Sequence, residues 1–207
     1  MSDLITRYKA HSGLTFSIHP LAHGAYQWVL SYPRLISWQH LPSALIRQLG
    51  QQPLQGLMRY QASSKAGGKM RPAEFQLFAP LWPAVYWDDP NPPDGTLLIH
   101  NDASHQPSDD EIETQAWASA LTLLVTSTDS RELSSLRDLF QAQLPSHMAR
   151  WFFDKTRISD RDLCQWTGCS RGTLVQQRQR VAINTQPNEP ISDPIELLNM
   201  DWSPDHG

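Results

Sequence analysis

Features that mark disulfide-stabilised, zinc-stapled and membrane proteins are scarce in this sequence. Its 207 residues include two cysteines, Cys164 and Cys169, which are too few for the usual four-ligand zinc site. No run approaches the ~20 consecutive apolar residues of a membrane helix, and residues 1–7 hold no positively charged leader followed by an apolar stretch. We therefore expect a cytoplasmic protein without membrane contact, whose cysteines are reduced and behave as small apolar side chains.

Catalytic motifs are also scarce. The sequence has no Gly-x-Ser-x-Gly nucleophile motif, and neither cysteine lies in a setting typical of a nucleophile. His19 and His23 are four residues apart, and His100, Asp102 and His105 fall within six residues, but neither spacing belongs to a specific hydrolase motif. We expect no enzyme activity, no cofactor and no metal. A metal-dependent enzyme that uses His100, Asp102 and His105 is an alternative.

Charge is distributed unevenly along the chain. The formal net charge of -4 disfavours phosphate binding by the chain as a whole. Residues 147–180, however, contain seven Lys or Arg and three acids, a formal charge of +4, whereas residues 181–207 contain five acids and no Lys or Arg. A basic segment is thus followed by an acidic, proline-rich tail over 186–207, which we expect to be disordered.

The first hundred residues have the composition of strands and turns. Alternating apolar and polar residues predict a strand over 13–20, and aromatic and β-branched residues predict another over 25–32. Further strands are predicted over 34–38, 54–60, 74–78, 81–87 and 96–100, and a short helix over 41–50. The tryptophans on these strands are expected to pack in the core.

Helical patterns begin after residue 107. Ser108 and Glu111 have the spacing of a capping box, and apolar residues at helical spacing follow them. More helices are predicted over 131–144 and 146–155. The predicted fold class is α+β, with an aromatic-rich, mostly antiparallel sheet domain over 1–107 and a helical region over 108–185. Alternatively, the helices over 108–155 pack on the sheet as one body.

Residues 160–179 predict two short helices joined by a tight turn. Ser159 and Ser170 are suitable N-caps, and Gly168 suits a left-handed turn. Leu163, Cys164, Cys169 and Leu174 occupy the positions where a helix-turn-helix buries apolar or small residues. The segment therefore resembles the helix-turn-helix superfamily of bacterial and phage DNA-binding proteins. It departs from the family at Thr167 and Gln177, two positions that are usually apolar.

The resemblance implies DNA binding through the second helix, whose first residues face base edges in the major groove. Base-reading residues would be Arg171, Thr173, Gln176 and Gln177, because Arg pairs with guanine and Gln with adenine. Phosphate contacts are expected from Arg157, Arg161, Arg178 and Arg180. The loop over 63–71 adds possible phosphate contacts through Lys65, Lys69 and Arg71 around two glycines, although it lacks the spacing of a nucleotide-binding P-loop.

The expected function is that of a non-enzymatic regulator or mobile-element accessory factor that binds DNA as a homodimer or within a larger complex. One alternative is a helical hairpin that packs on the protein or on a partner, with its Arg and Gln side chains in solvent. The chain would then be a structural subunit of a protein or ribonucleoprotein assembly.

Overall fold

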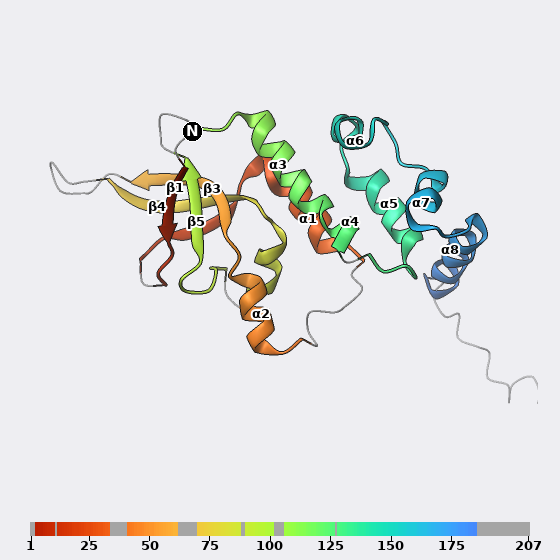
Figure 1. Ribbon diagram of the computed structural model, residues 1–207, viewed down its shortest axis with the longest axis horizontal. Coiled ribbons are helices and arrows are strands. Elements are labelled where there is room, and N and C mark those ends of the chain that lie inside the picture. The colour runs from red at the N-terminus through yellow and green to blue at the C-terminus, as the bar shows by residue number, and fades with distance from the viewer. Residues whose placement is uncertain are drawn as a thin grey trace, which may run out of the picture.

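The structure is a computed structural model of the chain, and it describes residues 3–10, 12–33, 41–61, 70–87, 90–101, 106–126 and 128–185. The strand predicted over 34–38 and the acidic tail over 186–207 lie outside these residues. The described part is elongated, with a sheet at one end and a group of helices at the other (Figure 1). The predicted α+β class is confirmed.

A five-stranded sheet with the strand order β1-β5-β3-β4-β2 forms the first end. Its strands are β1 (Asp3–Arg7), β2 (Thr15–Ile18), β3 (Leu54–Gln61), β4 (Arg71–Ala79) and β5 (Leu97–Asn101). β1 pairs with β5 and β3 with β4 in antiparallel fashion, but β2 pairs with β4 and β3 with β5 in parallel. The sheet is therefore mixed, where we expected a mostly antiparallel one. Parallel neighbours cannot be joined by a tight hairpin, and in each of these two pairs another strand of the sheet intervenes along the chain.

A tight approach between two central strands requires a glycine. At Gly56 of β3, an added Cβ would lie 2.5 Å from a ring carbon of Phe75 and 2.6 Å from the Gln76 carbonyl oxygen. Because Phe75 is fully buried, its ring has no room to retreat. The Gly56 position thus lets the Phe75 ring pack across the neighbouring strand.

The strand predicted over 25–32 is wrong, because this segment forms most of helix α1 (His23–Ser31). Ala25, Trp28 and Val29 are all fully buried, and their spacing of three and four residues is that of a helix face. The Trp28 ring lies 6.0 Å from that of Phe140 in the helical half. Helical spacing thus outweighed the strand propensity of the individual residues.

The strand predicted over 81–87 is also wrong. It forms the 3-10 helix η3 (Trp82–Tyr86), and Pro83 lies in its first turn. The Trp87 indole donates to the Gly50 carbonyl oxygen at 3.0 Å, which ties this segment to the end of α2 (Ser43–Gly50). The helix predicted over 41–50 is confirmed.

The remaining helices begin at the predicted capping box, in which the Ser108 hydroxyl accepts from the Glu111 amide. They are α3 (Asp109–Leu121), α4 (Leu123–Thr126), α5 (Leu133–Gln143), α6 (Ser146–Phe153), α7 (Asp160–Thr167) and α8 (Arg171–Thr185). α3 packs on β4 and on the short helix η1 (Pro20–Ala22), and α1 packs on both α3 and α5.

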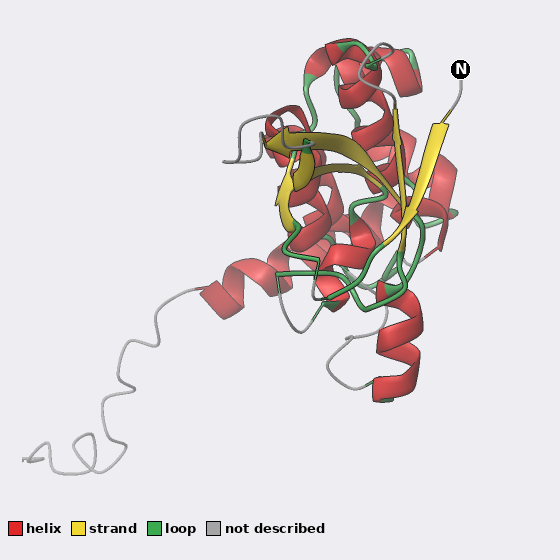
Figure 2. Ribbon diagram, turned by 90° about the vertical axis from the view of Figure 1, so that its left-hand side faces the viewer, coloured by secondary structure: helices red, strands yellow, loops and turns green. Residues whose placement is uncertain are grey.

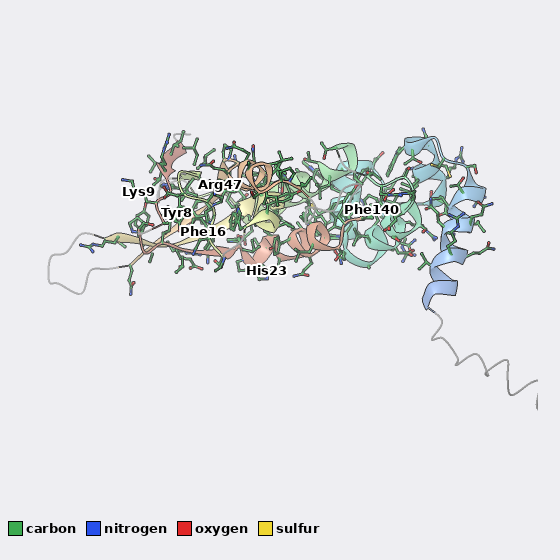
Figure 3. All side chains as sticks on the ribbon, turned by 90° about the horizontal axis from the view of Figure 1, so that it is seen from below. Tyr8, Lys9, Phe16, His23, Arg47 and Phe140 are labelled. Carbon is green, nitrogen blue, oxygen red and sulfur yellow. The ribbon has the colours of Figure 1, made fainter. Side chains whose placement is uncertain are left out.

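The buried side chains form one connected core across these elements. Figure 3 shows Tyr8 and Phe16 at the sheet end and Phe140 among the last helices. The pair α1 and α3 connects the sheet with α5–α8 (Figure 1). None of the described helices is long and apolar enough to cross a membrane.

Candidate nucleic-acid interface

Helices α7 and α8 have the boundaries expected from the sequence. Ser159 caps α7 through a capping box with Asp162, and Gly168 ends it in a left-handed conformation with φ of 72°. The Ser170 hydroxyl accepts from the Thr173 amide at 3.2 Å and so caps α8. These local interactions define an eight-residue helix, a tight turn and a capped second helix.

The apolar positions of the pair are filled as predicted. Leu163 and Leu174 are buried, and Cys164 and Cys169 are partly buried against the same core. Helix α5 packs against both α7 and α8, so the two helices lie on a third. One side of α8 is therefore fixed in the protein.

The two departures from the family pattern have structural reasons. Thr167, at the end of α7, donates through its hydroxyl to the Leu163 carbonyl oxygen at 2.6 Å and accepts from the Cys169 amide at 3.3 Å. It thereby bonds a carbonyl oxygen of α7 and a backbone amide of the turn that follows the helix. The polar residue at this position stabilises the turn.

Gln177 has a structural contact in place of the predicted base contact. Its side chain is 8% exposed, so the prediction that it faces a groove is corrected. Its Oε1 accepts from the Ser134 amide at 3.1 Å, and its Nε2 donates to the Ser130 carbonyl oxygen at 2.9 Å. Because Ser134 lies in the first turn of α5, Gln177 supplies an acceptor that this helix start lacks.

Arg178 also has an internal partner. It donates to Asp160 at 2.5 Å, and Arg137 of α5 lies 3.2 Å from the same carboxylate oxygen. The hydrogen bond from Arg178 is the main cause of a lowered pKa for Asp160, and this bond likewise raises the pKa of Arg178. Arg178 therefore ties α8 to α7, and Asp160 joins both of these helices to α5 through Arg137. This internal pairing corrects the assignment of Arg178 as a phosphate contact.

Asp162 is the second internally paired acid of this region. It is buried and bonded to Lys155, and its other oxygen accepts from the Ser159 hydroxyl at 2.6 Å. The hydrogen bond from Lys155, followed by those from Ser159, lowers the pKa of Asp162 to about 2. Both described acids of residues 155–185 are thus neutralised by neighbouring cations.

The other predicted contact residues of α8 lie on its outer side. Arg171, Gln176 and Arg180 are exposed, and Thr173 is half-buried beside the Ser170 hydroxyl. Arg157 and Arg161 are exposed before and on α7. Arg157, Arg161, Arg171 and Arg180 form no ion pair with a described residue. We call these four arginines together with Gln176 the α7–α8 surface.

Of the three phosphate contacts predicted over 63–71, the structure describes one, Arg71. Lys65 and Lys69 lie outside the described residues. Arg71 is exposed at the start of β4, and β4 lies at the opposite end of the molecule from α8 (Figure 1). Arg71 is therefore not part of the α7–α8 surface.

Two features of the region had no place in the sequence prediction. Trp166 of α7 is partly exposed and stacks on Phe153, with ring centroids 5.2 Å apart. Arg137 reaches Asp160 from α5, more than twenty residues away in sequence. Neither the Trp166–Phe153 contact nor the Arg137–Asp160 ion pair could be predicted from residue spacing within α7 and α8.

The histidines do not form a metal site in the described part of the chain, where no group of three or more His, Cys, Asp or Glu is placed to hold an ion. His100 is buried, and its Nε2 lies 3.0 Å from the Thr6 hydroxyl. Asp102 and His105 lie outside the described residues. His19 accepts from the Leu21 amide as the cap of η1, and burial is the main cause of its lowered pKa.

Comparison with known proteins finds no match to this chain. No protein-family model matches the chain, and no curated protein or solved structure does so either.

Proposed function

We propose that this chain is a non-enzymatic cytoplasmic DNA-binding protein, a transcriptional regulator or mobile-element accessory factor, that reads DNA through α8. The observation that carries the proposal is the two-sided character of this helix. Leu174 and Gln177 hold one side in the protein, whereas Arg171 and Gln176 are exposed on its first turns. Arg and Gln are the side chains that pair bidentately with guanine and adenine in the major groove.

Local electrostatics supports the same function. Asp160 and Asp162 are bonded to Arg178 and Lys155, so neither carboxylate is free to repel phosphate. The exposed arginines of the α7–α8 surface are available to hold phosphates on either side of the groove. This local positive surface offsets the negative charge of the whole chain.

Few phosphate contacts imply weak binding by one copy. A single unit of this type reads a few base pairs, so a specific site needs two copies or a larger complex. We therefore expect the recovered DNA site to contain two related half-sites about one helical turn apart.

The test is selection of genomic DNA fragments by the purified full chain, followed by sequencing. An Arg171→Ala/Gln176→Ala variant removes the exposed pair from α8, and an Arg47→Ala/Gln48→Ala variant removes an exposed pair of the same types from α2. A motif that is enriched by the wild type and the α2 variant, and is lost in the α8 variant, supports the proposal. Equal behaviour of all three proteins contradicts it.

A second candidate is a subunit of a protein or ribonucleoprotein assembly, because Trp151 of α6 is 72% exposed. It borders a groove between α3 and α6 that Met148 and Gln115 also line. Exposed tryptophan is enriched at protein interfaces. Co-purification of a defined partner or RNA that Trp151→Ala abolishes, without DNA enrichment, would favour this candidate over the first.

A further inference from the structure

Among the strands that the structure describes, β1 is an outer strand of the sheet with one neighbour, β5 (Figure 2). Leu4 and Ile5 are 44% and 67% exposed, so this edge carries apolar side chains on both of its faces. An edge strand with exposed apolar residues is a template for pairing with another strand, and proteins usually cover or charge such an edge. Residues 4–7 of β1 are exposed, and no proline interrupts the strand.

The backbone groups that face the open side can be identified from the ladder. The Tyr8 amide donates inward, to the Thr96 carbonyl oxygen of the segment before β5, at 2.8 Å. In an antiparallel pair, inward-bonded residues alternate with residues whose amide and carbonyl point away from the neighbour. Thr6 and Leu4 therefore bond inward, and Ile5 and Arg7 offer their backbone groups at the open edge.

We propose that β1 pairs with β1 of a second copy in antiparallel fashion, with the two-fold axis at Ile5. In this register, Ile5 stands opposite Ile5 of the other copy, and Asp3 stands opposite Arg7 at two symmetric positions. The outward-facing backbone groups of both copies then meet as hydrogen-bonded pairs. A two-fold interface of this kind uses the same surface on both subunits.

The charges of β1 select this arrangement over others. Opposite charges directly across a strand pair are stabilising, and like charges are destabilising. A parallel pair in register would place Asp3 opposite Asp3 and Arg7 opposite Arg7. A shift of two residues would pair either charge with Ile5. The antiparallel register centred on Ile5 is the arrangement that matches both charges.

The paired surface is small, because β1 has five residues. Stable protein interfaces commonly bury about 1,600 Å² in total. We therefore expect a dimer that dissociates on dilution. Its formation does not depend on DNA, so it can fail or succeed independently of the proposed function.

Sedimentation velocity of the full chain over a range of concentrations tests the dimer. Ile5→Lys places like charges at the two-fold axis and keeps the inward hydrogen bonds of β1. Leu45→Lys is the control, because Leu45 is an exposed aliphatic residue on α2. The wild type and the control are expected to dimerise as concentration rises, while Ile5→Lys stays monomeric with an unchanged circular dichroism spectrum.

Charge reversal tests the register itself. Asp3→Arg and Arg7→Asp each place like charges opposite one another and should weaken the dimer at least several-fold, whereas the double variant should restore it. A wild type that remains monomeric at the highest soluble concentration overturns the proposal. So does a dimer that neither Ile5→Lys nor the single reversals weaken.

Discussion

The two ends of this molecule are held together by different kinds of contact. At the sheet end, large apolar side chains such as Phe75 and Leu98 are fully buried between the elements. At the helical end, buried leucines are supplemented by polar contacts: Asp160 joins three helices, and Gln177 completes the start of α5. A polar residue on α7 or α8 can therefore have a structural role, and residue type alone does not distinguish a structural residue from a surface contact residue.

The largest change in unfolding free energy is expected when a buried apolar side chain is removed from the helical end. Leu174→Ala removes a fully buried side chain from α8 and should cost about 2–5 kcal/mol of unfolding free energy. Val175→Ala, at a neighbouring position that is 46% exposed, should change it by less than about 0.5 kcal/mol. Urea denaturation followed by tryptophan fluorescence measures both, and equal losses would contradict the packing described for α8.

The helical end should also be the more acid-sensitive of the two. The pKa of Asp162 is about 2, below its ordinary value of 3.8, because Lys155 and Ser159 stabilise the carboxylate. The folded state thus holds this group ionised, so its contribution is complete above pH 3.8 and is lost as pH falls toward 2.

Unfolding free energies measured down this pH range should fall less steeply for Asp162→Asn than for the wild type. Gln165→Ala, at an exposed uncharged residue of α7, is the control and should keep the wild-type slope. A wild-type slope in Asp162→Asn would refute the structural role given to this carboxylate.

Unlike Arg178, which is paired with Asp160, the exposed arginines of the α7–α8 surface should contribute to DNA affinity. Arg161→Ala should weaken binding evenly across sequences and lower the salt dependence, the slope of log affinity against log salt, by about 1. Arg47→Ala on α2 is the control. An unchanged slope in Arg161→Ala would remove this residue from the phosphate contacts.

The smallest effect is expected from the acidic tail. Because α8 continues to Thr185, a deletion should begin at residue 186, five residues later than the charge pattern alone suggests. Removing residues 186–207 should raise DNA affinity at low salt and have little effect at high salt, since ionic screening weakens competition by the tail. Binding assays at two salt concentrations test this, and equal affinity of the two proteins at low salt would show that the tail does not compete with DNA.

The helix starts that could be predicted from the sequence are those set by local interactions. The caps at Ser108, Ser159 and Ser170 each bond a backbone amide three residues away, so a short motif identifies them. Helix α1 was not predicted, because strand-forming residues such as Trp28 and Val29 lie at helical spacing there.

The helices of the candidate site could be predicted from the sequence, but the roles of some of their residues could not. Gln177 bonds to Ser134, which is 43 positions earlier in the chain, and no local pattern signals that contact. The neighbouring Gln176 has the same residue type and remains exposed. The packing of α8 on α5 buries Gln177 and leaves Gln176 exposed.

The most direct test of the different roles of Gln176 and Gln177 compares Gln176→Ala with Gln177→Ala. Both stability and binding to the DNA site recovered by selection are measured. We predict that Gln176→Ala relaxes the preference for one base pair and leaves the unfolding free energy unchanged. Gln177→Ala should lower the unfolding free energy by about 1–3 kcal/mol, because the Ser134 amide loses its acceptor, while the folded protein keeps its base preference. Loss of base preference in Gln177→Ala but not in Gln176→Ala would contradict the account.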